Sequence, residues 1–272
     1  MKTRVLVGVI GVPAIILIIL FAPGWLFGAV VGAVAAIAAW ELLHCVQPDM
    51  PKRMVAYAAV GAFLLPLCTG LGCYELVERF VLWALVVIMF CEVMLTFRGE
   101  ERLDFSNVTL VVFAGFVLPM LFTSLVRLDL RESGWAYVFL PFVAAFSSDS
   151  GAYFAGMALG KHKLAPHLSP KKTIEGSIGG FLAAIVLMLV YGLILKVCGL
   201  TVNFLILAIY GFFGSLAGQL GDLAFSAIKR QHDVKDYSHI IPGHGGILDR
   251  FDSMLFIAPM IELLLMWVPA VM

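Results

Sequence analysis

The sequence has few charged residues. Only 13% of its 272 residues are Asp, Glu, Lys or Arg, whereas 62% are hydrophobic, and the mean hydropathy is +1.02. Lys and Arg balance Asp and Glu at 18 each, so the net charge gives no indication of nucleic-acid binding. Apolar residues in long runs are typical of an integral membrane protein and exclude a soluble globular core.

The chain also lacks a linker and paired cysteine motifs. No Pro/Ser-rich stretch or long charged run divides it, so we expect one polytopic domain over residues 1–272. Residues 1–133 are expected to form a helical frame and residues 134–272 the catalytic half. The five cysteines have no CxxC spacing, which argues against zinc or disulfides and predicts small buried hydrophobic residues.

Nine apolar windows are long enough to cross a membrane. They run approximately over residues 5–22, 24–43, 54–71, 79–97, 107–126, 135–159, 176–197, 201–228 and 251–271. The first follows MKTR as in a signal peptide, but it has no clear A-x-A cleavage site, so we expect an uncleaved span. The expected fold class is an all-α polytopic membrane protein with about nine transmembrane helices and cytosol-facing polar loops.

The basic residues are distributed unevenly between the ends of these windows. With a cytosolic N-terminus, all but four of the 18 Lys and Arg residues fall on the inner side. The four outer ones are Arg79, Arg127, Arg131 and Lys196. This asymmetry places the polar loops 160–175 and 229–250 in the cytosol, and we expect a site at the inner (cytoplasmic) membrane that uses both loops.

The first five windows carry little chemistry. GxxxG at Gly28 and Gly32 predicts close helix packing, and Glu41 is expected to be an interface residue. Glu92 lies within a span, where an ionisable group is costly and commonly functional. A protonated glutamate that donates a hydrogen bond to a neighbouring helix is the alternative.

A polar group lies in the window 135–159. Asp149 precedes Gly160 by 11 residues, which corresponds to about 16 Å along a helix. A carboxylate at that depth requires a cation or a donor, and Tyr153, four residues later, shares its face. We therefore consider Asp149 a candidate metal ligand and Ser148 and Tyr153 candidate substrate-binding residues, with a helix–helix hydrogen-bond cluster as the alternative.

The loop 160–175 combines cations and hydroxyl groups. Its GMALGKH run is not a P-loop, because the GxxxxGK[ST] spacing is one residue short. Ser169, Lys172 and Thr173 precede an expected helix, whose free N–H groups would complete a phosphate-binding cradle. A loop that only sets topology and contacts lipid headgroups is the alternative. The GxxxG at Gly176 and Gly180 predicts packing.

The window 201–228 ends in a polar stripe. Gln219, Asp222, Ser226 and Lys229 follow one another at spacings of three, four and three, so they share one helix face. Asp222 lies 21 residues beyond Thr201, about 31 Å, which is one hydrocarbon thickness. The stripe is therefore expected to emerge at the cytosolic interface.

A second acidic stripe opens the window 251–271. Asp249, Asp252 and Ser253 have helical spacing, and acids suit a helix N-terminus. Either stripe alone is explained equally by a solvated helix end. The two stripes flank residues 242–246, PGHGG, whose backbone N–H groups could approach phosphate oxygens, and carboxylates are hard ligands suited to Mg²⁺.

The residues between Ser226 and Asp252 resemble the signature of a known family. They read S-x-I-K-R-x4-K-D-x-S-x2-I-P-G-H-G-G-I-x-D-R-x-D, and every fixed position of the phosphatidate cytidylyltransferase (CDP-diacylglycerol synthase) signature is filled. DSGAY at residues 149–153 and GKHKLAP..SP.KT...IGG at residues 160–180 also resemble that family. Lys171 departs from the pattern, whereas Lys172 and Thr173 fit it.

This resemblance covers the C-terminal half and implies a reaction. CTP and phosphatidate would give CDP-diacylglycerol and pyrophosphate with Mg²⁺ at the cytosolic membrane face, in a homodimer. Joining two polyanions requires charge neutralisation and in-line positioning.

We assign the candidate residues by this chemistry. The catalytic residues are Asp222, Asp249, Lys229, Arg250 and Lys172. Asp222 and Asp249 are the expected metal ligands, with Asp149 and Asp252 as further ligands or supporting groups. The substrate-binding residues are Ser148, Tyr153, Ser169, Thr173, Ser226, Arg230, Lys235, Gly243, His244, Gly245 and Gly246.

Two other functions are compatible with parts of the sequence. A CTP-dependent polyprenol or lipid kinase would use similar groups, but the intact 226–252 signature argues against it. An ion-coupled transporter could relay protons through Glu92, Asp149 and Asp222. No inverted repeat is apparent, however, and the acids gather at the cytosolic end of the helices.

Overall fold

The computed structural model describes residues 2–99, 103–241, 243 and 245–270, with only the backbone described for residues 2–10 and 12. Its helices pack into two compact units. The first consists of Met1–Leu130 and Asp236–Arg250, and the second of Arg131–Lys235 and Phe251–Met272.

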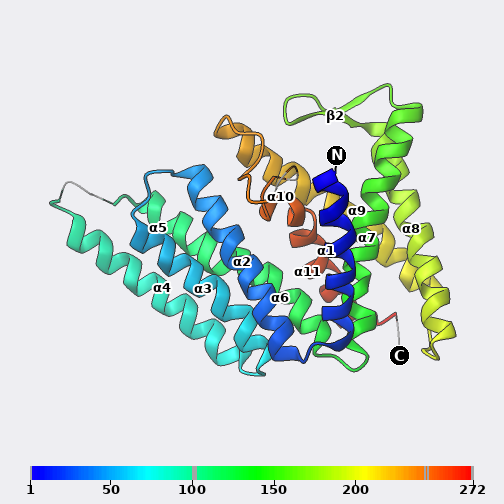
Figure 1. Cartoon of the computed structure of the whole chain (residues 1–272), viewed down its shortest axis with the longest axis horizontal. Coiled ribbons are helices and arrows are strands. Elements are labelled where there is room, and N and C mark those ends of the chain that lie inside the picture. The colour runs from blue at the N-terminus through cyan, green and yellow to red at the C-terminus, as the bar shows by residue number, and fades with distance from the viewer. Residues whose placement is uncertain (1, 100–102, 242, 244, 271–272) are drawn as a thin grey trace. The chain divides into compact units, whose positions relative to one another are not determined.

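The first unit is built from long antiparallel helices (Figure 1). They are α1 (Lys2–Phe21), α2 (Gly24–Val46), α3 (Lys52–Gly70), α4 (Tyr74–Thr96), α5 (Phe105–Val112), the π-helix η1 (Phe113–Val117) and α6 (Leu118–Asp129). The short helix α10 (Leu248–Phe251) begins in this unit. Helices α5, η1 and α6 follow one another without a break and form one span, Phe105–Asp129.

Small residues let α2 and α3 approach closely. A β-carbon at Gly28 would lie 2.5 Å from the Pro66 carbonyl oxygen, and one at Gly32 would lie 2.6 Å from the Phe63 carbonyl oxygen. Both distances are too short for any side chain, so only glycine allows this contact. The packing role predicted for the first GxxxG motif is therefore confirmed.

The second unit contains α7 (Gly134–Leu159), β1 (Lys163–Ala165), β2 (Ser169–Thr173), α8 (Ile174–Val197), α9 (Phe204–Gln231) and α11 (Met254–Trp267). Helices α7, α8 and α9 lie side by side in Figure 1. A β-carbon at Gly176 would lie 2.8 Å from the Ala152 carbonyl oxygen, and one at Gly180 would lie 3.0 Å from that of Ser148. The second GxxxG motif therefore packs α8 against α7, as predicted.

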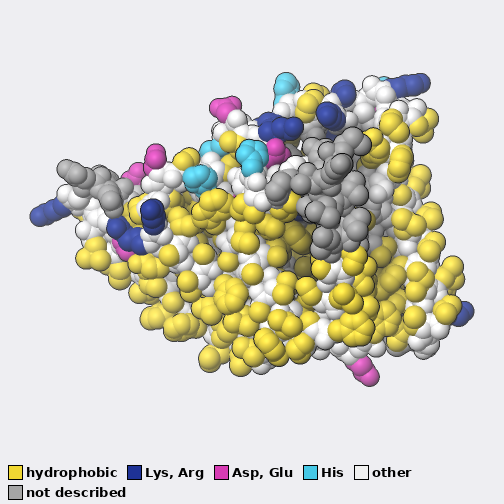
Figure 2. Space-filling view, in the orientation of Figure 1, with side chains coloured by type: hydrophobic (Ala, Val, Ile, Leu, Met, Phe, Trp, Pro, Cys, Tyr) yellow, Lys and Arg dark blue, Asp and Glu magenta, His cyan; other side chains and the backbone are white. Residues whose placement is uncertain are grey.

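The helices are suited to a membrane. Within the described residues, six are long and apolar enough to cross one: α2, α3, α4, the continuous Phe105–Asp129, α8 and α9. Large hydrophobic side chains such as Leu76, Leu95 and Val197 are exposed, and hydrophobic side chains cover most of the surface visible in Figure 2. The expectation of a mostly helical membrane protein is thus confirmed. Membrane crossing by α1, α7 and α11 remains a prediction.

Two local predictions need correction. The loop 160–175 contains an antiparallel hairpin, in which Lys163 pairs with Thr173 and Ala165 with Ser169. The last apolar window does not begin as one continuous helix. Helix α10 ends at Phe251, Asp252 and Ser253 form a turn, and α11 begins at Met254.

The prediction of buried cysteines is correct only for Cys45. Cys68 is half-buried, Cys73, Cys91 and Cys198 are exposed, and none of the five forms a disulfide. The apolar character of these positions does not require burial inside the protein, because a lipid-facing helix surface is also apolar.

Candidate active site

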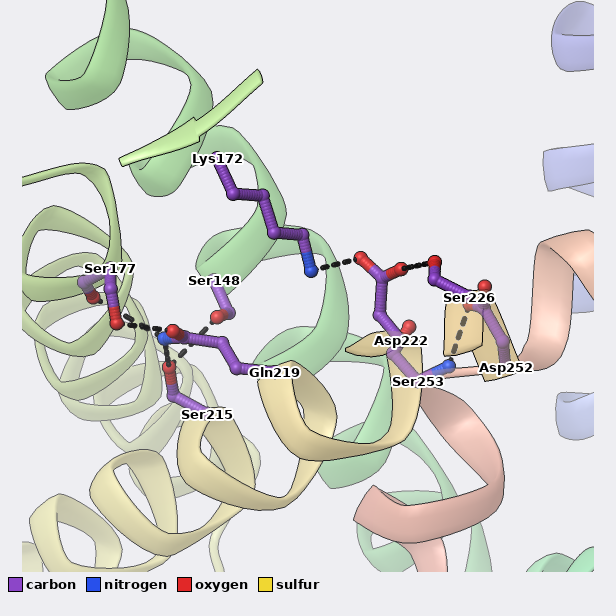
Figure 3. A network of polar contacts seen from close by, with 9 residues as sticks. All are labelled: Ser148, Lys172, Ser177, Ser215, Gln219, Asp222, Ser226, Asp252 and Ser253. Carbon is purple, nitrogen blue, oxygen red and sulfur yellow. Dashed lines mark hydrogen bonds and ion pairs between the residues drawn. The ribbon is translucent and has the colours of Figure 1, made fainter. Parts of the chain in front are cut away.

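An ion pair joins the end of the hairpin to α9. Lys172 Nζ lies 2.5 Å from Asp222 Oδ2, and the Ser226 hydroxyl donates to Asp222 Oδ1 over 3.2 Å (Figure 3). The side chains of Lys172 and Asp222 are 27% and 29% exposed. The structure therefore brings the loop 160–175 to the polar stripe of α9, at a place that solvent can still reach.

A second carboxylate lies in the same neighbourhood. Asp252, in the turn before α11, is buried, and its Oδ1 accepts a hydrogen bond of 2.7 Å from the Ser253 N–H. Burial raises the pKa of the Asp252 carboxyl to about 7. The charge of Asp222 adds to this rise, the buried Lys229 opposes it, and Asp149 contributes a smaller increase. Excess negative charge gathered at one place favours a cation there.

The donor groups fit Mg²⁺. Among the described residues, no three His, Cys, Asp or Glu side chains are close enough to form a ready-made metal centre. Mg²⁺ does not require one, because it keeps several waters and is commonly bound through one or two carboxylates together with substrate phosphates. Asp222 and Asp252 offer such carboxylates, and the exposed Asp149 interacts with Asp252 electrostatically.

A partly buried hydrogen-bond network lies one helical turn from the ion pair. The hydroxyls of Ser148 and Ser215 are 2.8 Å apart, and the Gln219 amide donates to the Ser215 hydroxyl and to the Ser177 carbonyl. The Ser177 hydroxyl in turn donates to the Gln219 side-chain oxygen (Figure 3). Ser148 therefore joins α7 to α9, which fits the helix–helix cluster that the sequence left open. Tyr153 is exposed and stacks edge-on against Phe154.

The N–H groups at the start of α8 are not free as expected. The Thr173 hydroxyl accepts the Gly176 N–H at 3.1 Å, and the Ile174 N–H donates to the His162 carbonyl. Glu175 accepts the backbone N–H groups of Lys161 and His162. Thr173 thus caps the helix. The N–H groups of Ile174 and Gly176 are therefore already bonded, while Lys172 and the half-buried Ser169 remain candidates for phosphate binding.

The remaining expected cations differ in exposure. Lys229 is buried, whereas Arg230, Lys235 and Arg250 are exposed. The Arg230 guanidinium donates to the Val234 carbonyl at 2.7 Å and so closes the end of α9.

The glycine turn is wrapped around Asp249. Asp249 Oδ2 accepts the N–H groups of Tyr237 at 2.8 Å and Gly246 at 2.9 Å. Gly243 and Gly245 have φ of 78° and 79°, a conformation that favours glycine. A phosphate at the Gly246 N–H would have to replace Asp249. His244 lies outside the described residues.

Sequence reasoning missed the role of Glu41. This residue of α2 is fully buried and accepts three hydrogen bonds from the segment before and at the start of α10. It had been expected only to lie at a helix interface. An acid within an apolar helix was the available signal, but its partners are 197 to 207 residues further along the chain.

Comparisons with known proteins cover both units. Residues 2–268 match the model of the Cytidylyltransferase family. The phosphatidate cytidylyltransferase of Bacillus subtilis is 36% identical, with 97% of each chain covered. Proteins of the same name from Staphylococcus epidermidis and Staphylococcus aureus are each 34% identical, covering 97% and 93% of this chain and 99% and 96% of their own.

The chain belongs to the cytidylyltransferase family, a group of nucleotidyltransferases. The similarity extends through the N-terminal half, where the sequence motifs had shown only helices. Residues of that half, Glu41 among them, can therefore be considered for a role in the family's reaction.

Proposed function

We propose that this chain is a phosphatidate cytidylyltransferase, which converts CTP and phosphatidate to CDP-diacylglycerol and pyrophosphate. Its whole-length similarity to proteins of that name carries the proposal. The cluster of Lys172, Asp222 and Asp252 supports it, because a cation beside carboxylates suits the joining of two phosphate groups.

The reaction needs little covalent help from the protein. An oxygen of the phosphatidate phosphate attacks the α-phosphorus of CTP and forms a new P–O bond. The bond from the α-phosphorus to the bridging oxygen breaks, and pyrophosphate leaves with the electron pair. A phosphate monoester is already largely ionised at neutral pH, so no strong general base is required, and His244 suits the role of a hydrogen-bond donor.

The protein's own residues would neutralise and orient the phosphates. We assign this work to Lys172, Lys229 and Arg250, because cations positioned at developing negative charge lower the barrier in a partly dehydrated site. Asp222 and Asp252 would hold Mg²⁺, with Asp149 and Asp249 as further candidates. When bound, Mg²⁺ would offset phosphate charge.

The location and assembly belong to the same proposal. The uneven distribution of basic residues supports a multi-pass protein of the inner (cytoplasmic) membrane with its site facing the cytosol. The family resemblance supports a homodimer. Cross-linking in native membranes, followed by measurement of the product's mass, tests whether the protein is a homodimer.

Position-specific labelling of CTP tests the activity. Purified protein is incubated with phosphatidate in detergent micelles, Mg²⁺, and CTP labelled at either the α- or the γ-phosphorus. Cytidylyl transfer labels the lipid only from α-labelled CTP, whereas a lipid kinase labels a polyprenol or other lipid only from γ-labelled CTP. Lipid labelling only from the γ position, or from neither, would overturn the proposal.

A further inference from the structure

The buried carboxylate of Glu41 holds a segment that carries an expected site residue. Glu41 Oε1 accepts the Ser238 hydroxyl at 2.5 Å and the Ile247 N–H at 2.9 Å, and Oε2 accepts the Leu248 N–H at 2.6 Å. A buried carboxylate is costly unless hydrogen bonds compensate it. Here every bond has Glu41 as the acceptor, and bonds to a carboxylate are stronger than those between neutral groups.

Three consecutive backbone N–H groups donate hydrogen bonds to two carboxylates. The Gly246 N–H goes to Asp249, and the next two, of Ile247 and Leu248, go to Glu41. Leu248 directly precedes Asp249 in α10. Any shift of the backbone at Leu248 must therefore move Asp249. Glu41 itself is fully buried, so it cannot contact a soluble substrate.

The close packing around Glu41 also explains why residue 246 is a glycine. A β-carbon at Gly246 would lie 2.5 Å from Glu41 Oε1, 2.7 Å from its Cδ and 2.8 Å from its Oε2. Atoms cannot approach that closely, so the turn passes over Glu41 only because residue 246 has no side chain.

We propose that Glu41 is a positioning residue for the transfer reaction, which acts by fixing Asp249 through the backbone of residues 246–248. This rests on the proposed function. It assigns to Glu41 of α2 a part in fixing Asp249, an expected site residue of the same unit.

The test uses the full-length protein with the variants Glu41→Gln, Glu41→Ala, Gly246→Ala and Glu41→Ala/Gly246→Ala. Glu262→Gln is the matched control, because Glu262 is another glutamate that is buried in an apolar helix. The measurements are hydrogen exchange at residues 241–250, the unfolding temperature, kcat, and KM for CTP and for phosphatidate.

Glu41→Gln should quicken exchange at Ile247 and Leu248 and lower kcat about 10- to 100-fold, as is common when a group supporting a ligand is lost. The KM for CTP should change much less, and the unfolding temperature should match that of Glu262→Gln. Gly246→Ala should also lower kcat. The double variant should be no worse than Glu41→Ala, because removal of the carboxylate makes room for the methyl group.

Several results would overturn the positioning role: unchanged exchange and kcat in Glu41→Gln, an equal loss in Glu262→Gln, or losses that multiply in the double variant. Glu41→Gln keeps the side-chain shape, so it also tests the proposal if Glu41→Ala does not fold. A wild-type protein without turnover would remove the proposed function, while the exchange comparison would still report whether Glu41 holds the turn.

Discussion

Lys172 of β2 and Asp222 of α9 form an ion pair whose Nζ and Oδ2 atoms are 2.5 Å apart. One residue was expected to bind phosphate and the other Mg²⁺, and in this structure each neutralises the other. Each therefore has a partner to exchange when substrate and metal bind. Until then, the ammonium group of Lys172 and the carboxylate of Asp222 compensate each other's charge, so neither is left unpaired beside the membrane.

Removal of Lys172 should impair catalysis more than folding. We expect Lys172→Ala to lower kcat/KM by about 30- to 1000-fold, equivalent to about 2–4 kcal/mol of transition-state stabilisation, by analogy with loss of a single oxyanion donor. The unfolding temperature should change little, since partly exposed ion pairs contribute little to stability. Steady-state kinetics with both substrates measure the effect.

Lys171→Ala is the matched control for this prediction. Lys171 is the preceding residue of the same strand, is exposed, and departs from the family pattern. Near-wild-type activity of both variants would remove the hairpin from the site.

Activity should depend on Mg²⁺ through Asp222. Chelation by EDTA should abolish turnover, and Mg²⁺ should restore it. Asp222→Asn should lower kcat by orders of magnitude and raise the Mg²⁺ concentration required for half-maximal rate, because an amide lacks the charge that a hard cation prefers. Asp233→Asn provides the control, since Asp233 is exposed with φ of 54°, which asparagine also tolerates. Identical Mg²⁺ titrations of the two variants would contradict the assignment.

Hydropathy located the helices well, because the hydropathy of a window depends only on residues that are neighbours in the sequence. Each of the nine windows overlaps a helix of the described chain, although the last is interrupted at Asp252 and Ser253, and both GxxxG motifs proved to be packing contacts. The hairpin at residues 163–173 was missed because its strands are short and polar and contain Pro170. The break at Asp252 was missed because the spacing of Asp249, Asp252 and Ser253 also fits a helix.

The sequence predicted which residues belong to the candidate site, but it did not predict which of them contact each other. The motifs indicated Lys172 and Asp222 separately, and only the fold shows that they contact each other. Glu41 could not be connected to Ile247 by any local pattern, because hydrogen bonds across about 200 residues depend on tertiary structure.

The serine–glutamine network should stabilise the helices of the second unit. Gln219→Leu removes the acceptor of the Ser177 hydroxyl and a donor to Ser215. We expect a loss of about 1 kcal/mol, typical of interhelical hydrogen bonds in membranes, measured by SDS-induced unfolding. Gln231→Leu, at the exposed C-terminal end of α9, should have a smaller effect. An equal effect of both substitutions would show that the network does not stabilise the packing.

The distribution of basic residues predicts that the hairpin and the segment around residue 239 face the cytosol. His167 and His239 are both exposed, so cysteines introduced there can react with a thiol reagent. In variants that retain one cysteine each, both should be labelled only after a membrane-impermeant reagent gains access to the cytosol. The native Cys198 is exposed beside the outer Lys196 and should be labelled in intact cells. Labelling of His167→Cys or His239→Cys from outside, with Cys198 protected, would reverse the orientation and place the proposed site on the face that CTP does not reach.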